Sequence, residues 1–261
     1  MARISLVILS LLLSVSSALS HDLWLQPEPD PSRPGGLVFR AVVGASFPKW
    51  EEAKQAADYS QVRTRTSGPP ILPLPAPEDP TLLGRAPGDA AFFVAAPGPA
   101  REIDLKPSEA RGYLIEEVGL DGKAIESLLK EAGPTLHETY SRILRLLVIP
   151  RGSALPADAP FGLPLEILLL RLDRGEGPGA EIAFRLLRDG KPLPGAAVRL
   201  LSPGRKFPLL RTDARGEATA RVDGGKPLLL AFIELVGSGK GRYETRWTNL
   251  AIFDERTQPS K

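Results

Sequence analysis

Two histidines, His21 and His137, are the only imidazole side chains in this sequence of 261 residues. The sequence contains no cysteine, and its single methionine is Met1. Disulfides, thiolate zinc sites, iron–sulfur clusters and cysteine nucleophiles are therefore excluded. A transition-metal site in this chain must use nitrogen and oxygen ligands, which makes the two histidines the first candidates.

The first twenty residues have the pattern of a secretory signal peptide. Arg3 is followed by an apolar run over residues 4–13 and by small residues up to position 20, as such leaders require. Cleavage after Ser20 makes His21 the N-terminal residue, and this position is favoured over cleavage after Ala18. The apolar run is too short to span a bilayer. We therefore expect a periplasmic or secreted protein, with no transmembrane segment in the mature chain.

An N-terminal histidine offers a metal ion both its α-amine and its ring Nδ1. With His137 as a third nitrogen, His21 would complete a T-shaped site that suits Cu(II) or Ni(II). Asp22 and Glu138 are expected to orient these ligands or to add oxygen atoms, and Tyr140 is expected to lie on the side of His137. The alternative leaves His21 exposed at the start of a first strand and His137 hydrogen-bonded in a loop.

Short alternating apolar segments separated by glycine and proline must position these residues, and they predict an all-β protein. In the second half of the chain the strands recur about every ten residues, which is typical of a β-sandwich. After the signal peptide (residues 1–20), we expect two immunoglobulin-like β-sandwich domains, one over residues 21–165 and one over residues 166–261.

One or two short helices are expected in the connections. Residues 50–58 and 123–131 have helical composition, and the second segment ends at a Gly-Pro pair. Residues 113–118 continue the strand pattern. Residues 137–149 alternate in a way that predicts a strand, with a helix as the alternative. Residues 67–80 contain too many prolines for either element and are expected to form an extended loop.

Six short segments, spread over most of the mature chain, carry motifs that resemble a known family. They are residues 21–25 (HDLWL), 137–142 (HETYSR), 162–167 (GLPLEI), 184–198, 212–216 (TDARG) and 243–253. Together they are similar to the family called domain of unknown function 4198 (DUF4198). That resemblance implies an exported bacterial protein associated with nickel or cobalt uptake. Members commonly carry a proline-containing stretch where this chain has LLLRLD at residues 168–173, so no function is transferred from that segment.

The C-terminal half also resembles the transthyretin-like or carboxypeptidase-regulatory sandwich, an accessory module of many exported proteins. Residues 166–261 are therefore expected to form a transthyretin-like β-sandwich.

Charge and motifs limit the functional classes. The chain has 33 basic and 31 acidic residues, a net charge of +2, and no basic block that indicates nucleic acid as a partner. It lacks the Gly-x-Ser-x-Gly elbow of serine hydrolases. We therefore expect a non-enzymatic accessory protein that binds nickel, cobalt or copper and works with a metal transporter or envelope component. The alternatives are a histidine-brace copper oxygenase acting on polysaccharide and a metal-free adhesion or scaffold module.

Overall fold

A computed structural model describes residues 22–59, 61–66, 72–73, 79–132, 134–173, 179–239 and 241–256. Within these residues the strands form three sheets, and short helices lie in the connections. The predicted all-β class, with one or two short helices in connections, is thereby confirmed. The predicted signal peptide, His21 and most of the expected loop at residues 67–80 lie outside the described residues.

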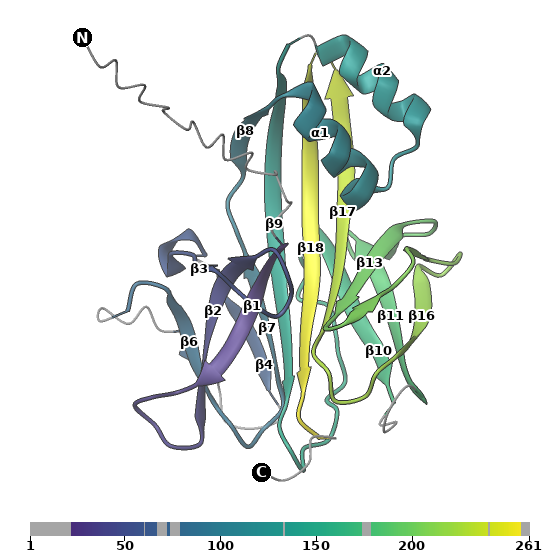
Figure 1. Ribbon diagram of the computed structural model, residues 1–261. Coiled ribbons are helices and arrows are strands. Elements are labelled where there is room, and N and C mark those ends of the chain that lie inside the picture. Colours follow the sequence, from purple (N-terminus) through teal and green to yellow (C-terminus); the bar gives the residue numbers. More distant parts are fainter. Residues whose placement is uncertain are drawn as a thin grey trace, which may run out of the picture.

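A nine-stranded sheet runs through the middle of the molecule (Figure 1). Its strands follow the order β14-β13-β17-β18-β9-β7-β4, and β15 and β8 pair at the sides of β13 and β9. Their bounds are β4 Arg63–Thr66, β7 Phe92–Pro97, β8 Arg101–Leu105, β9 Leu136–Ile149, β13 Ala197–Ser202, β14 Arg205–Lys206, β15 Leu210–Arg211, β17 Leu228–Gly239 and β18 Arg242–Asp254. The long strands β9 and β18 lie side by side and run parallel.

Two smaller sheets complete the described β-structure. A five-stranded sheet has the order β1-β2-β6-β5, with β3 on β2, and a four-stranded sheet has the order β10-β11-β12, with β16 on β11. The bounds are β1 Asp22–Pro29, β2 Gly36–Gly44, β3 Glu52–Ala53, β5 Leu72–Pro73, β6 Leu82–Pro87, β10 Leu165–Leu172, β11 Ala180–Arg188, β12 Lys191–Pro192 and β16 Glu217–Val222.

Strand alternation explains how the three sheets stack. In β7, Phe92 belongs to the apolar cluster shared with the five-stranded sheet, and Phe93 belongs to the cluster shared with the four-stranded sheet. Leu146 and Leu147 in β9 divide in the same way. Because successive strand residues point to opposite faces, a continuous apolar run gives a strand that is buried on both sides. The central sheet is thus the middle layer of three, with one sandwich on each face.

The domain boundary expected between residues 165 and 166 falls at the start of β10. The central sheet takes strands from both sides of this position: β4, β7, β8 and β9 precede it, and β13, β14, β15, β17 and β18 follow it. The division of the chain into two domains at this position stays a prediction.

Helices cover one end of the central sheet. In Figure 1, α1 (Pro107–Tyr113) and α2 (Gly122–Ala132) lie over the upper ends of β9, β17 and β18. Their apolar side chains form a third cluster with these strands, to which Leu114 and Ile125 contribute from the helical side and Leu136 from β9. The helix expected at residues 123–131 is confirmed by α2.

Two local predictions are wrong. The strand expected at residues 113–118 is instead helical, because α1 begins with Pro107 in its first turn and Glu109 accepts a 3.0 Å hydrogen bond from the Lys106 N–H, both of which start a helix. A π-helical turn (Leu114–Val118) then continues α1.

The helix expected at residues 50–58 also does not form. The N–H of Lys54 donates to the carbonyl of Ala41 in β2 at 2.8 Å. Edge pairing with β2 therefore produces β3, and only Ala56–Asp58 forms a short 3-10 helix.

Candidate functional site

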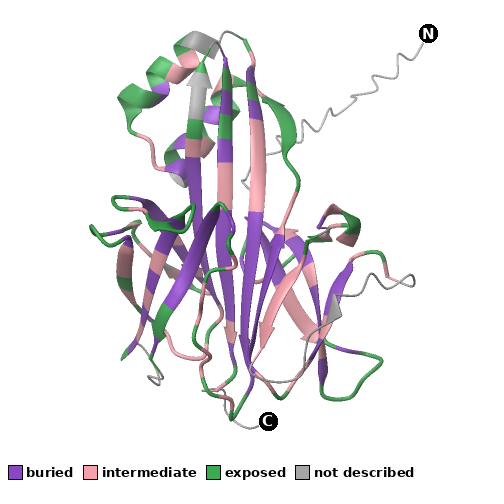
Figure 2. Ribbon diagram, turned by 180° about the vertical axis from the view of Figure 1, so that it is seen from behind, coloured by how far each residue is buried: buried purple, intermediate pink, exposed green. Residues whose placement is uncertain are grey.

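The upper half of β9 is the part of the described sheet where polar side chains gather. From Ile143 to Ile149 every residue of β9 is buried, whereas the segment from His137 to Arg142 mixes exposed, intermediate and buried residues (Figure 2). Three arrangements lie around this half: an exposed pair at His137, a buried cluster at Glu138, and a pocket beside Arg142.

The exposed pair consists of His137 and Asp104. Antiparallel pairing of β8 with β9 places Asp104 directly opposite His137, and His137 Nδ1 lies 2.6 Å from Asp104 Oδ1. The two side chains are 50% and 69% exposed. When the ring proton is on Nδ1, this hydrogen bond fixes the tautomer and leaves the Nε2 lone pair available, as in metal-binding histidines.

The surroundings of this pair are open. Glu102 and Arg242 line a cavity of about 70 Å³ beside it, and Arg242 is the residue of β18 paired with His137. No cluster of three or more histidine, aspartate or glutamate side chains suited to hold a metal ion occurs in the described part of the chain. The pair therefore supplies an incomplete ligand set, which a metal ion would complete with water or with groups from elsewhere.

Asp22 lies elsewhere, at the start of β1. Its carboxylate forms an ion pair with Arg199 of β13, with an Nη2–Oδ1 distance of 2.7 Å. This ion pair ties the first described residue of the chain to β13 of the central sheet. The role predicted for Asp22, orienting a metal ligand, stays a prediction.

His21 lies outside the described residues, so a site that joins it to His137 also stays a prediction. The first described residues of β1 lie beside the middle of β9. The carbonyl of Leu23 accepts a hydrogen bond from Asn249, and Asn249 is level with Leu144 of β9. Leu144 is seven residues along β9 from His137, a rise of roughly 23 Å.

The buried cluster centres on the Glu138 carboxylate, whose residue is 4% exposed. It accepts hydrogen bonds from the hydroxyls of Tyr113 (3.0 Å), Tyr243 (3.3 Å) and Thr245. Burial raises the pKa of Tyr113 and of Tyr243, and the Glu138 charge raises both further. Both phenols thus remain hydrogen-bond donors at neutral pH, and they stabilise the buried carboxylate without a cation.

Strand alternation separates this cluster from His137. Glu138 and Tyr140 point to the face of the central sheet opposite to His137, and α1 contributes Tyr113 from that face. Tyr140 therefore does not share the side of His137. The described hydrogen-bond partners of the Glu138 carboxylate are hydroxyl groups, and its role in supporting a metal ligand stays a prediction.

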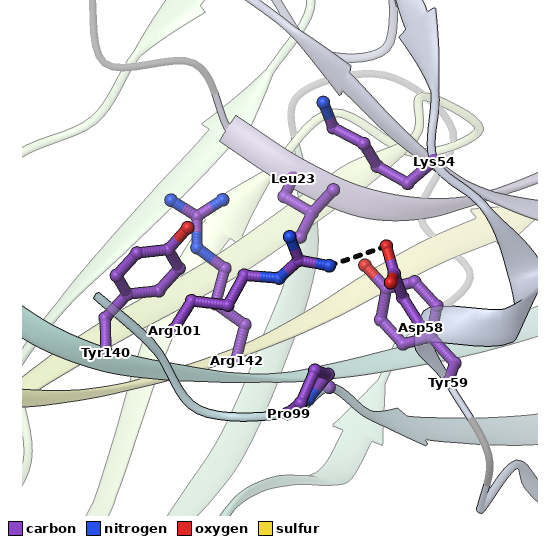
Figure 3. Close-up of a pocket in the computed structure, with 9 residues that line it drawn as sticks. Leu23, Lys54, Asp58, Tyr59, Pro99, Arg101, Tyr140 and Arg142 are labelled. Carbon is purple, nitrogen blue, oxygen red and sulfur yellow. Dashed lines mark ion pairs between the residues drawn. The ribbon is translucent and has the colours of Figure 1, made fainter. Parts of the chain in front are cut away.

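The pocket lies on the same face as Glu138, between β8, β9 and the start of β1 (Figure 3). It has a volume of about 140 Å³. Arg101 on its wall forms an ion pair with Asp58, with an Nη2–Oδ2 distance of 2.7 Å. The guanidinium carbon of Arg142 lies 5.1 Å from the ring centre of Tyr140 and 4.4 Å from that of Trp247.

Sequence reasoning identified one lining residue of this pocket, Tyr140, and missed the others. They come from separate segments around residues 23, 54–59, 98–101 and 140–142, and no local motif connects them. One sequence signal could have pointed to the pocket. Arg142 and Arg145 lie in a mostly apolar strand, and a buried or half-buried guanidinium needs a hydrogen-bond partner.

Comparison with known proteins gives one match. The family model described as "Domain of unknown function (DUF4198)" matches residues 18–231. No curated protein and no solved structure matches the chain. Among the described helices, none has the length and apolar character that crossing a membrane demands.

Proposed function

This chain belongs to the DUF4198 family, and we propose that it is an exported accessory protein that binds a divalent transition-metal ion at His137. The observation that carries the proposal is the 2.6 Å contact between His137 Nδ1 and Asp104 Oδ1 on an exposed sheet surface. Nickel, cobalt and copper are the proposed ions, because imidazole nitrogen suits all three. The signal-peptide pattern of residues 1–20 supports export to the periplasm or the exterior.

An incomplete ligand set fits an accessory role. One imidazole nitrogen, with Asp104 orienting the ring or adding an oxygen atom, binds an ion weakly and leaves coordination positions open. An ion held in this way exchanges readily with a partner that completes the coordination sphere. We therefore propose a metal transporter or another envelope component as that partner. The proposed transthyretin-like form of the C-terminal part agrees with an accessory module.

The test is a binding titration of the mature, metal-free protein with Ni(II), Co(II) and Cu(II). We expect one ion per chain, with at least a tenfold loss of affinity in His137→Ala and a smaller loss in Asp104→Asn, because the carboxylate orients the ring. Asp89→Asn is the matched control, since Asp89 is exposed and precedes β7, whose Phe92 pairs with Val148 at the end of β9 opposite to His137. Its affinity should equal that of the unmodified protein.

Two outcomes overturn the proposal. If no ion binds, the metal-free scaffold alternative remains. If His137→Ala binds as tightly as the unmodified protein, the ion sits elsewhere. A variant with an additional alanine before His21 then decides whether the mature N-terminus is the ligand, because the extension displaces the α-amine from the histidine. Intact mass of the secreted protein establishes the cleavage position for these experiments.

A further inference from the structure

We infer that the pocket beside Arg142 is a binding site for a small organic anion, whose carboxylate group pairs with the Arg142 guanidinium. This site lies on the opposite face of the central sheet from His137. It does not depend on the proposed metal function, and each can fail without the other.

The charges lining the pocket leave one cation without a counter-charge. Of the three basic residues, Arg101 pairs with Asp58 at 2.7 Å and Lys54 pairs with Glu52 at 2.7 Å. No ion pair of Arg142 occurs among the described residues. The pocket therefore carries an excess positive charge, which attracts an anion and repels a free divalent cation.

Arg142 is held in place without being neutralised. The rings of Tyr140 and Trp247 lie next to its guanidinium, and Tyr113 stacks on Trp247 with ring centres 5.5 Å apart. Cation–π contact orients a guanidinium but offers no acceptor for its N–H groups. The Nε of Arg142 is accordingly buried without a hydrogen-bond partner among the described residues. Buried polar groups in native proteins are nearly always paired, so an acceptor is expected here.

Two phenols add donors to the same pocket. The hydroxyls of Tyr59 and Tyr140 make no hydrogen bond within the described part of the chain, and both residues line the cavity (Figure 3). Burial raises the pKa of Tyr59 to about 12, so this phenol keeps its proton at neutral pH. A guanidinium and two phenols thus face one small volume.

Size and shape favour a carboxylate. The volume of about 140 Å³ corresponds to about five water molecules, which admits a carboxylate with a short carbon chain. The planar guanidinium matches the two oxygens of a carboxylate. Leu23 and Pro99 supply apolar wall for the carbon chain. A single unpaired guanidinium also balances one carboxylate charge better than the charge of a phosphate dianion.

The test is a calorimetric titration of metal-free protein with acetate, succinate and citrate, with inorganic phosphate and with acetamide. Acetamide is the matched neutral control for acetate. We expect at least one carboxylate to bind at millimolar concentration or below and acetamide not to bind. Arg142→Met should lose at least tenfold in affinity, and Arg142→Lys should lose less, because it keeps the charge but not the planar pair of donors.

Arg33→Met is the control for loss of one positive charge, because Arg33 is exposed in the turn before β2. Circular dichroism and melting temperature establish that each variant is folded. The proposal is overturned if no carboxylate binds, or if Arg142→Met binds as tightly as the unmodified protein. Tighter binding of phosphate than of every carboxylate overturns the ligand class. Retained carboxylate binding in His137→Ala separates this site from the metal site.

Discussion

The two halves of β9 differ in whether their buried charged side chains form ion pairs. In the lower half, Arg145 forms an ion pair with Asp158 at 2.6 Å, and both side chains are 0% exposed. In the upper half, Glu138 is surrounded by hydroxyls and Arg142 by aromatic rings, and neither has a described partner of opposite charge. Internal neutralisation indicates a structural role. A cation left unneutralised beside a cavity indicates a ligand.

Further contacts of the lower pair agree with a structural role. Arg145 also donates to the carbonyl of Ile167, and Asp158 accepts from the Leu169 N–H at 2.9 Å. These bonds tie the segment before β10 to both β9 and β10. Burial raises the pKa of Asp158, and the charge of Arg145 opposes that rise. The pair therefore depends on both partners being present.

The largest expected effect comes from breaking that pair. Arg145→Met leaves the Asp158 carboxylate buried without a cation, and we expect a loss of about 3–5 kcal/mol in the free energy of unfolding. Urea denaturation of the unmodified and variant proteins measures it. The double variant Arg145→Met with Asp158→Asn should recover part of the loss, because the uncompensated charge is gone. If the free energy of unfolding of the single variant falls by less than about 1 kcal/mol, the ion pair is not a major structural contact, and the proposed difference between the two halves of β9 is wrong.

A second expected effect concerns the buried phenols, two beside Glu138 and one in the pocket beside Arg142. The pKa values of Tyr59, Tyr113 and Tyr243 are raised, chiefly by burial, so these three of the four tyrosines should resist ionisation in the folded protein. In an unfolded chain they ionise near pH 10. Since the folded pKa values are the higher ones, stability should fall as the pH rises above about 10.

Phenolate absorbance measures this effect. At pH 11 the folded protein should show markedly fewer phenolates than the urea-unfolded protein, in which nearly all of the four tyrosines ionise. Glu138→Gln removes the negative charge beside Tyr113 and Tyr243, so more phenolate should form at pH 11 than in the unmodified protein. An unchanged titration in this variant would mean that the Glu138 carboxylate does not act on the two phenols.

The all-β class was predictable from the sequence, because burial on one face leaves a period of two in a strand and burial on both faces leaves a short continuous apolar run. The strand at residues 137–149 follows from its alternation, whereas the place of β7 between two sheets depends on how the sheets stack. The strand expected at residues 113–118 does not form. The helix that starts at Pro107 and Glu109 continues through these six residues, and their alternation does not stop it.

The candidate site was much less predictable, because its contacts join residues far apart in the chain. Arg142 and Arg145 are both arginines in one strand, three positions apart. Alternation places them on opposite faces, but it does not show that one meets Asp158 and the other a cavity. Likewise, His137 is a candidate ligand from composition alone, whereas its partner Asp104 depends on the pairing of β8 with β9.

The smallest expected effect on stability is that of Arg142→Met in the absence of ligand. The substitution removes cation–π contacts worth about 0.5–1 kcal/mol each at exposed sites, but it breaks no described ion pair and relieves a buried Nε that lacks a partner. We expect the free energy of unfolding to change by about 1 kcal/mol or less.

A carboxylate at a hundred times its dissociation constant should then stabilise the unmodified protein by about 2.7 kcal/mol and leave the stability of Arg142→Met unchanged. Arg145→Met, in contrast, should lose the same free energy with and without the ligand. Urea denaturation of the three proteins, each with and without the carboxylate, measures both differences. If Arg142→Met is as destabilising as Arg145→Met without ligand, the Arg142 guanidinium is structural, and the upper half of β9 differs from the lower half only in exposure.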